Sequence, residues 1–321
     1  MPELPEVEVL VRYLAPQVVG QTIRRIRVLD ARSLRGPSPE RFKRKLRNSL
    51  FTSVRRRGKY LIFGLQHGTK RFSLIGHLGM TGRMHIRPHG APFSPHTTIG
   101  LNLGDVELLF EDPRRFGGFT FDSKVIDRLG PEPLDKSFTI ALFRTALGGS
   151  RQAIKVRLLD QGLIAGVGNI YASEALFLAQ LHPATPCCQL NDSDIRRLRT
   201  CIRRTLREAI RFGSSLPLYF ASHTKSDGLF YFGSAPTESK SAVERFHVYD
   251  RDGMPCPRCG KPIERMRQAT RSTYYCPRCQ PKRRRQELAS SFHLDRLLDK
   301  NCRSKSHPHR PQRSQPKGLR I

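Results

Sequence analysis

This 321-residue sequence has no tryptophan, no long apolar run and few acidic side chains. Because no uninterrupted hydrophobic stretch approaches the roughly 20 residues that a spanning helix needs, we expect no membrane-spanning segment. Glutamates at positions 3, 6 and 8, with no basic region ahead of them, argue against a secretory signal. We therefore expect a cytoplasmic chain in a reducing compartment, without disulfides.

The charge balance is strongly basic. Fifty-seven Lys and Arg residues against 27 Asp and Glu residues give a net charge of +30. From residue 281 onward, 12 basic and 3 acidic residues supply +9, so the first 280 residues still carry +21. A basic body indicates a polyanionic partner. A membrane surface is the alternative, but the basic residues are spread through sequence that is patterned to fold, so we expect no membrane partner.

The first fourteen residues are patterned as a helix. Leu4, Val7, Leu10 (or Val11) and Leu14 recur at helical spacing and predict a stripe that faces a core. Proline suits a first helical turn, where its missing N–H would lack a partner anyway, and the nearby glutamates suit the positive end of the helix dipole.

Pro2 is a candidate nucleophile. A small second residue normally allows removal of Met1, which would leave a secondary amine beside Glu3 and Glu6. An α-amine has a pKa of roughly 8, so a neutral fraction exists near pH 7 and can attack a carbon to form a Schiff base. From these residues alone, an ordinary amphipathic helix with a proline cap is the simpler interpretation.

Residues 20–125 are rich in strand patterns, with Gly-, Pro- or His-containing turns between them. A short basic helix at 39–48 interrupts the series. Many short strands at this spacing indicate a sandwich or a barrel. The expected strands are 23–29, 51–65, 72–86, 98–103 and 106–121.

The period becomes helical after residues 129–134, a Gly- and Pro-containing segment that we interpret as a domain boundary. The last expected helix has an apolar stripe with seven Arg on its other faces, Asn191 or Ser193 as N-cap and Gly213 as C-cap. Residues 214–247 show no clear period and indicate a long loop. The expected helices are 138–147, 153–159, 169–180 and 195–212.

Cys256, Cys259, Cys276 and Cys279 form two C-x2-C knuckles with 16 residues between them. This spacing predicts a four-cysteine zinc site. The zinc would be structural, because four protein thiolates leave no open position for water. Arg265, Arg267 and Arg271 would lie on the intervening β-hairpin and favour a phosphate-binding face over plain solvated surface.

Two motifs contain glycine beside a polar residue. The turn from Gly166 to Asn169 opens a helix, and its backbone N–H groups offer an anion site for which a DNA phosphate is a sensible ligand. Lys59 follows Gly58 in what we expect to be a strand. It either points at an active site or faces outward, and spacing alone favours neither.

Two further motifs place large side chains next to glycine. Met80, in His77-Leu-Gly-Met-Thr-Gly82, is either a core residue beside a bulge or an exposed wedge between bases. Phe116, in Asp112-Pro-Arg-Arg-Phe-Gly117, is either part of a solvated turn or a stacking residue beside two Arg.

Taken together, these motifs resemble the bacterial formamidopyrimidine-DNA glycosylases, and the resemblance covers residues 1–280. The motifs occur in the order typical of that family. They are Pro2-Glu-Leu-Pro-Glu6, Gly58-Lys-Tyr60, His77-Leu-Gly-Met80, Asp112-Pro-Arg-Arg-Phe-Gly117, Leu129-Gly-Pro-Glu-Pro133, Gly166-Val-Gly-Asn-Ile-Tyr171 and the four-cysteine finger.

The resemblance implies an α+β protein with DNA in the cleft between its two main parts. It implies an N-terminal β-sandwich catalytic domain at 1–130 and a helical helix–two-turn–helix domain at 131–250. The latter contains a lesion-covering loop at about 214–246. A zinc finger at 251–280 holds one zinc ion. Residues 281–321 extend past the family's usual end as a basic, disordered tail or DNA-binding arm, with a short helix around 288–298.

The resemblance also implies roles for single residues. Pro2 would attack the sugar C1′, Glu3 would be the general acid and base, Glu6 would support the site, and Lys59 would contact phosphate and assist elimination. Met80, Arg114 and Phe116 would fill the gap left by a flipped nucleotide. Further DNA contacts would come from His96, Arg115, Arg151, Lys155, Asn169 and Arg271.

The implied function is excision of oxidised purines (8-oxoguanine and formamidopyrimidines) from double-stranded DNA, with abasic-site lyase activity, by a monomer. A sister glycosylase for oxidised pyrimidines is a rival, but it would usually carry Gly where Leu4 stands. A non-catalytic zinc-ribbon DNA-binding protein is the other alternative, and it would have no need of Pro2, Glu3 and Lys59. Pro217-Leu-Tyr219 departs from the family's loop, which leaves lesion preference open.

Overall fold

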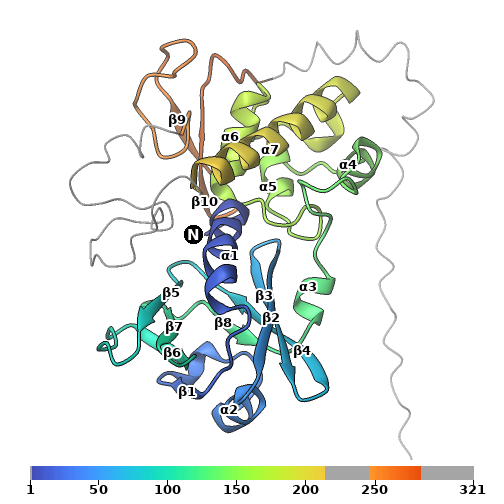
Figure 1. Ribbon diagram of the computed structural model, residues 1–321. Helices are drawn as coiled ribbons and strands as arrows, with labels where there is room; N and C mark the ends of the chain where they lie inside the picture. Colours follow the sequence, from blue (N-terminus) through green and yellow to red (C-terminus); the bar gives the residue numbers. More distant parts are fainter. Residues whose placement is uncertain (1, 214–245, 283–321) are drawn as a thin grey trace, which may run out of the picture.

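The computed structural model describes residues 2–213 and 246–282 (Figure 1). A β-rich lower half contains two four-stranded sheets, an upper half is helical, and a Cys-rich unit with a two-stranded hairpin lies beside the helices. The α+β class and this three-part architecture confirm the prediction. Residues 214–245 of the expected loop and the tail beyond 282 lie outside the described residues.

The two sheets of the lower half are antiparallel. One has the order β2-β3-β4-β8 and the other the order β1-β6-β7-β5. The strands of the first sheet are β2 (Leu50–Arg57), β3 (Tyr60–His67), β4 (Lys70–His77) and β8 (Gly118–Thr120). Those of the second are β1 (Arg25–Val28), β6 (Thr97–Asn102), β7 (Val106–Glu111) and β5 (Arg83–Pro88).

Three expected strands are each divided in two. Residues 51–65 form a hairpin of β2 and β3, because Gly58 adopts a φ of +55° and reverses the chain. Lys59 therefore lies in a turn, and its predicted place in a strand was wrong. Residues 72–86 divide at Gly79, and 106–121 divide at 112–117, so that each of these segments passes from one sheet to the other.

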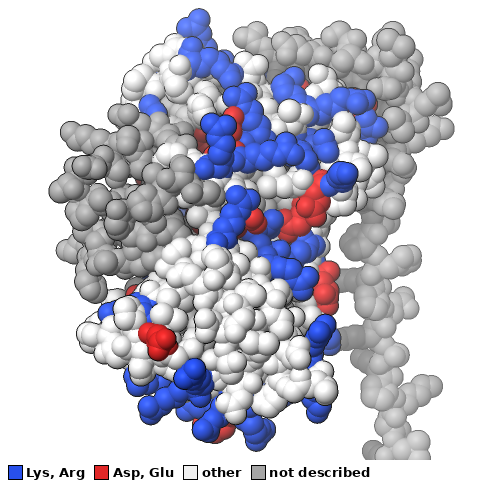
Figure 2. Space-filling view, in the orientation of Figure 1, with Lys and Arg blue, Asp and Glu red and all other residues white. Residues whose placement is uncertain are grey.

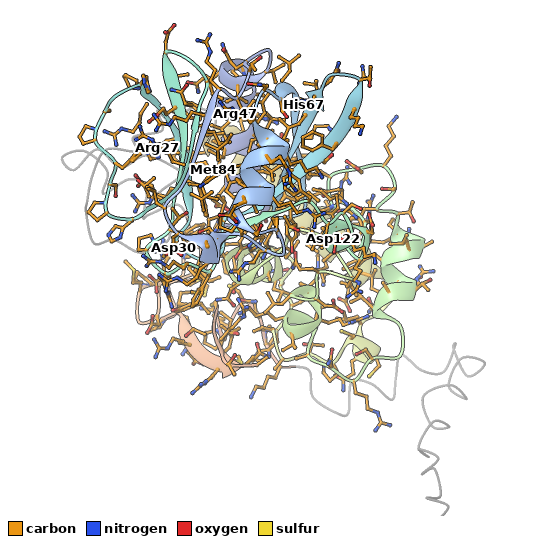
Figure 3. All side chains as sticks on the ribbon, turned by 90° about the horizontal axis from the view of Figure 1, so that it is seen from below. Arg27, Asp30, Arg47, His67, Met84 and Asp122 are labelled. Atoms are coloured by element: carbon orange, nitrogen blue, oxygen red, sulfur yellow. The ribbon has the colours of Figure 1, made fainter. Side chains whose placement is uncertain are left out.

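The core of the sandwich lies between the inner faces of the two sheets. Met84 on β5 is fully buried there, next to Gly76 of the facing sheet (Figure 3). Phe119 of β8 packs on Phe63 of its own sheet and edge-on to Phe110 of the other. The short basic helix α2 (Pro39–Leu46) adds Phe42 to this core.

Helix α1 (Leu4–Val18) belongs to both halves of the molecule. Val7, Leu10 and Leu14 are buried in the core of the sandwich, whereas Leu4 is buried in the core of the helical half. The predicted apolar stripe is confirmed. Its division between two cores places the first turn of α1 at the junction of the two halves.

The described part of the helical half contains four helices. The long helix α7 buries its predicted stripe, and Asn191 is its cap, because the Asn191 Oδ1 accepts the Asp194 N–H at 2.9 Å. Gly213 is the last described residue of α7, so its predicted capping role is not visible. These helices are α4 (Ile140–Leu147), α5 (Ile154–Leu158), α6 (Asn169–Leu178) and α7 (Asp192–Gly213). The short helix α3 (Lys124–Asp127) lies lower down, beside the first sheet of the lower half (Figure 1).

The Cys-rich unit contains the hairpin of β9 (Glu264–Gln268) and β10 (Arg271–Tyr275). Its small core includes Val248 and Tyr274 and packs on Phe177 of α6. The three predicted hairpin arginines lie on these strands.

None of the described helices has both the length and the apolarity required to cross a bilayer.

Candidate active site

The carboxylate of Glu3 lies at the N-terminus of α6. Its oxygens accept the backbone N–H groups of Ile170 at 2.9 Å and Tyr171 at 3.3 Å. The free N–H groups and the dipole of a helix start favour a negative charge at this position. Gly168 permits the contact, because a Cβ there would lie 2.4 Å from a Glu3 oxygen. The predicted anion site at this Gly-rich turn is thus occupied by a side chain of the protein itself.

Glu6 fixes the backbone that follows Pro2. Its Oε2 accepts the Glu3 N–H at 2.7 Å, and its Oε1 accepts the Tyr171 hydroxyl at 2.5 Å. Burial and the nearby Glu3 carboxylate raise the pKa of Glu6 to about 7. Burial and these carboxylates also raise the pKa of Tyr171 well above its ordinary value. The Glu6 carboxyl is therefore poised to hold or release a proton near neutral pH.

Pro2 precedes these anchored groups directly and is buried. The next residues are held on two sides, since the Leu4 N–H donates to the Gly166 carbonyl at 3.0 Å and the Glu3 N–H donates to Glu6. The chain end is therefore held against the start of α6, with two carboxyl groups beside it. An amine at Pro2 would have both a rigid position and proton-exchanging neighbours.

Lys59 reaches the same place from the β2–β3 turn and is only 9% exposed. A Cβ on Gly168 would lie 2.7 Å from its Nζ, so Lys59 and Glu3 contact the same glycine. Burial lowers the pKa of Lys59; Arg271 acts in the same direction, and Glu3 opposes it. Of the two interpretations left open by the sequence, the structure supports the inward one.

Glu132 holds the turn that carries Lys59. It accepts the Gly58 N–H at 2.5 Å and pairs with Arg56 at 2.7 Å and Arg57 at 3.2 Å. The sequence pattern indicates only a domain boundary at 129–134 and predicts no role for Glu132. A carboxylate placed between two prolines in an otherwise apolar segment was the signal available in the sequence.

Lys155, Asn169 and β10 form a second buried cluster. Lys155 is 1% exposed, and its Nζ donates to Asn169 Oδ1 at 2.7 Å, Thr273 Oγ1 at 2.7 Å and the Ser272 carbonyl at 3.1 Å. Asn169 Nδ2 also donates to the Ser272 carbonyl, at 3.0 Å. Burial lowers the pKa of Lys155 to about 7. The cluster attaches the start of α6 to the strand that begins with the exposed Arg271.

The residues expected to enter a DNA duplex lie on loops of the sandwich. Met80 is 39% exposed and Phe116 is 53% exposed, which is unusual for side chains of this size. The Arg114 guanidinium lies over the Phe116 ring, 5.1 Å from its centroid. For both motifs the structure therefore shows exposed side chains rather than a core methionine or an ordinary turn.

Three other expected DNA contacts occupy different settings. The Arg115 guanidinium pairs with Asp30. Hydrogen bonds from Arg32 and Arg115 hold the pKa of the Asp30 carboxyl well below its usual range. His96 is exposed beside the Phe116 loop, since its carbonyl accepts the Asp112 N–H at 3.0 Å. Arg151 is exposed in the segment before α5.

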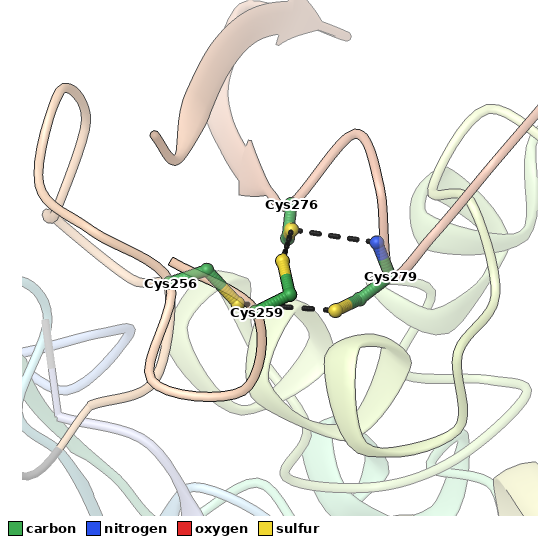
Figure 4. Close-up of side chains that lie close together, drawn as sticks. All are labelled: Cys256, Cys259, Cys276 and Cys279. Atoms are coloured by element: carbon green, nitrogen blue, oxygen red, sulfur yellow. Dashed lines mark hydrogen bonds between the residues drawn. The ribbon is translucent and has the colours of Figure 1, made fainter. Parts of the chain in front are cut away.

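The four predicted cysteines converge at one point (Figure 4). Their Sγ atoms all lie within 4.8 Å of one another, with Cys256 and Cys279 at 3.9 Å and Cys259 and Cys276 at 3.5 Å. Tetrahedral zinc with Zn–S bonds of about 2.3 Å requires sulfur separations of about 3.8 Å. The donor set and its spacing therefore fit one structural zinc ion, as the sequence predicted.

Three family descriptions match successive parts of the chain. "Formamidopyrimidine-DNA glycosylase N-terminal domain" matches residues 1–119, and "Formamidopyrimidine-DNA glycosylase H2TH domain" matches 129–218. "Zinc finger found in FPG and IleRS" matches 253–282. The matched segments carry, respectively, Pro2 and Lys59, Asn169, and the four cysteines.

Whole-chain comparisons give the same family. The formamidopyrimidine-DNA glycosylase of Symbiobacterium thermophilum is 40% identical over 88% of this chain and 90% of its own length. That of Thermus thermophilus is 42% identical over 87% and 98%. A Lactococcus lactis enzyme in complex with DNA containing a formamidopyrimidine lesion superposes with a TM-score of 0.76, at 34% identity over 88% of this chain and 100% of that one. The same bacterium's enzyme on abasic-site DNA gives a TM-score of 0.75, at 34% identity over 87% and 100%.

Proposed function

Because the chain belongs to the formamidopyrimidine-DNA glycosylase family, it is a DNA glycosylase of base-excision repair, and we propose that it removes oxidised purines and then cleaves the strand as a lyase. The match of all three parts sets aside a non-catalytic zinc-ribbon protein. The observation that carries the mechanism is the convergence of Glu3, Glu6 and Lys59 on the segment that begins with Pro2.

In this mechanism the Pro2 nitrogen bonds to C1′ of the damaged nucleotide and the glycosidic bond breaks. Opening of the sugar at the C1′–O4′ bond then leaves an iminium. A secondary amine has no second proton to lose, so this iminium stays cationic and acidifies the C2′–H bond. Loss of that proton expels the 3′ phosphate, and a further elimination expels the 5′ phosphate. Removal of Met1 is a condition for the first step, because only then is the amine free.

Glu3 is the residue we assign to proton transfer. It lies next to Pro2, and its carboxyl oxygens accept two backbone N–H groups that hold the side chain in place. It would protonate the leaving sugar oxygen and take protons in the eliminations. Glu6 would position the backbone of Glu3, and Lys59 would stabilise the departing phosphate from its buried turn.

Double-stranded DNA with an oxidised base is the proposed partner, bound by a monomer in the cytoplasm. A Lactococcus lactis relative was crystallised with DNA that contains Fapy-dG. On the face shown in Figure 2, Lys and Arg gather over α7 and near the junction of the halves, where Asp and Glu patches lie among them. A surface of this kind attracts the phosphate backbone without reading sequence. The domain limits at residues 130, 250 and 280 are part of this proposal.

We propose that base flipping is assisted by Met80, Arg114 and Phe116, whose exposure supports the role. Extruding a nucleotide costs a few kcal/mol of stacking and pairing, and inserted side chains offset part of that cost. His96, Arg115, Arg151, Asn169 and Arg271 are proposed to contact the backbone. Lys155 is buried within the protein, so we propose that it supports Asn169 and β10 instead of touching the lesion.

Borohydride trapping on duplex DNA containing 8-oxoguanine tests the proposed function. The protein with Met1 removed should yield a covalent protein–DNA adduct, and Pro2→Gly should yield far less. An undiminished adduct from Pro2→Gly would overturn the assignment of the nucleophile. Trapping on oxidised thymine alone would favour the sister enzyme for oxidised pyrimidines.

A further inference from the structure

The two exposed apolar side chains of the sandwich belong to loops that are distant in sequence. Met80 lies between β4 and β5, and Phe116 lies between β7 and β8. Both loops connect one sheet to the other, and the strands on either side of them pair, with His77 opposite Gly118 and Arg83 opposite Glu111. Strand pairing therefore brings the two loops side by side but leaves residues 78–82 and 112–117 to be held by other contacts.

Asp112 joins these loops through its side chain, which is completely buried. Its Oδ1 accepts the Thr81 hydroxyl at 2.6 Å, from the residue next to Met80. The same oxygen accepts the Arg114 N–H at 3.1 Å, and Oδ2 accepts the Gly117 N–H at 2.7 Å. One carboxylate thus binds the Met80 loop through Thr81, and it binds the Phe116 loop through the N–H groups of Arg114 and Gly117, on either side of Phe116.

The backbones of the two loops are also in direct contact. A Cβ on Gly79 would lie 2.4 Å from the Gly117 nitrogen and 2.9 Å from the Phe116 Cβ. A Cβ on Gly117 would lie 2.7 Å from the His77 carbonyl oxygen. Neither loop has room to move independently of the other, and the part-buried hydrogen bond between Asp112 and Thr81 fixes their relative position.

We propose that Asp112 and Thr81 are positioning residues that make the two loops one rigid unit, so that Met80 and Phe116 enter the duplex together. The inference rests on the proposed function. It separates the residues that enter the duplex, Met80 and Phe116, from those that only position them, Asp112 and Thr81. Insertion works best when the inserted side chains need no ordering on binding, because that ordering would otherwise oppose the unstacking step. A hydroxyl that bonds a buried carboxylate supplies such order without touching DNA.

Thr81→Val is the sharpest variant, because it removes the hydroxyl and keeps the shape. We expect excision from duplex 8-oxoguanine DNA to slow about tenfold, the loss typical of one bond to a charged buried group. Fluorescence of 2-aminopurine placed opposite the lesion should report slower or smaller unstacking. Thr81→Ser should restore both signals, and Thr69→Val, in the exposed β3–β4 turn, is the matched control.

A single-stranded abasic oligonucleotide distinguishes a loss of loop positioning from a general loss of enzyme activity. Its cleavage leaves no gap in a base stack for Met80 and Phe116 to fill. Thr81→Val should cleave it within about twofold of wild type, a change far below the loss of one such bond. Equal loss on both substrates, or an unimpaired Thr81→Val on the duplex, would overturn the proposal. Asp112→Asn, with a thermal unfolding control, provides a second variant. If wild type itself excises nothing, the proposed function fails instead.

Discussion

The Tyr171 hydroxyl oxygen lies 2.5 Å from Glu6 Oε1, and the other oxygen of the same carboxyl accepts the Glu3 N–H at 2.7 Å. The start of α6 is therefore connected, through one buried carboxyl group, to the peptide that follows Pro2. Neither Tyr171 nor Glu6 needs to touch the substrate for this connection to affect the reaction.

Tyr171→Phe should slow formation of the covalent intermediate about tenfold, because it removes a hydrogen bond to a buried carboxyl group. That bond lowers the pKa of Glu6, so its loss should raise the apparent pKa in the pH profile of trapping. Affinity for a duplex with a stable abasic analogue should change little. An unchanged trapping rate with an unchanged profile would contradict the connection.

Glu6→Gln should alter the pH dependence of stability. The folded protein raises the pKa of Glu6 from 4.5 to about 7, so it favours the protonated form. The stabilisation from this group is complete below pH 4.5 and is lost as the pH rises through 7. Relative to Glu6→Gln, wild type should lose up to about 3 kcal/mol of unfolding free energy over that interval. Denaturant unfolding of both proteins from pH 5 to 8 measures the difference.

Lys155→Met and Arg271→Ala should weaken DNA binding in distinguishable ways. Lys155 donates its hydrogen bonds to protein groups, so its loss should lower affinity without changing the slope of log K against log salt. Arg271 is exposed, and its loss should reduce that slope by about 1 if it contacts a phosphate. Titration from 50 to 200 mM salt decides between these roles. A reduced salt slope for Lys155→Met would instead show that Lys155 contacts DNA directly.

Glu132→Gln should be strongly destabilising although it lies outside the catalytic cluster. It removes a charge that faces two arginines and is itself 9% exposed, and breaking a buried pair of this kind costs about 3 kcal/mol. Below the unfolding temperature, strand cleavage by the variant should still be slower than by wild type. The turn that carries Lys59 is held by the bond from the Gly58 N–H to the Glu132 carboxylate, and the substitution weakens that bond. A normal melting temperature would refute the first expectation.

Removing zinc should abolish DNA binding before it unfolds the sandwich. Four thiolates fix the ends of the β9–β10 hairpin, and Arg271 lies at its tip. A chelator, or Cys279→Ser, should release one zinc ion per chain and disorder the hairpin, since metal binding supplies the folding energy of such units. Zinc release by a colorimetric dye and near-UV circular dichroism measure the two effects. Cys188→Ser, outside the cluster, is the control.

Much of the molecule could be predicted because its signals are local. The zinc knuckles, the stripe of α1 and the capping of α7 each depend on residues within a few turns of one another. The division of 51–65 into a hairpin was missed because Gly58 interrupts an otherwise continuous apolar pattern, and a positive φ is not visible in periodicity.

The parts that could not be predicted depend on contacts between distant segments. Glu3 and Ile170 are 167 residues apart, and Glu132 reaches Gly58 across 74 residues. No spacing rule connects such positions. Lys155 also shows that a lysine in a helical pattern can be buried and saturated by protein acceptors, although its charge suggests a surface role.

The division of α1 between two cores has a mechanical consequence. Glu3 and Leu4 are fixed to the helical half, whereas Leu10 and Leu14 are fixed to the sandwich. Any hinge between the halves would have to pass through the first turn of this helix, where Glu6 already binds both the backbone and Tyr171. We therefore expect the halves to act as a stiff clamp, so that it is the DNA that bends to fit the protein.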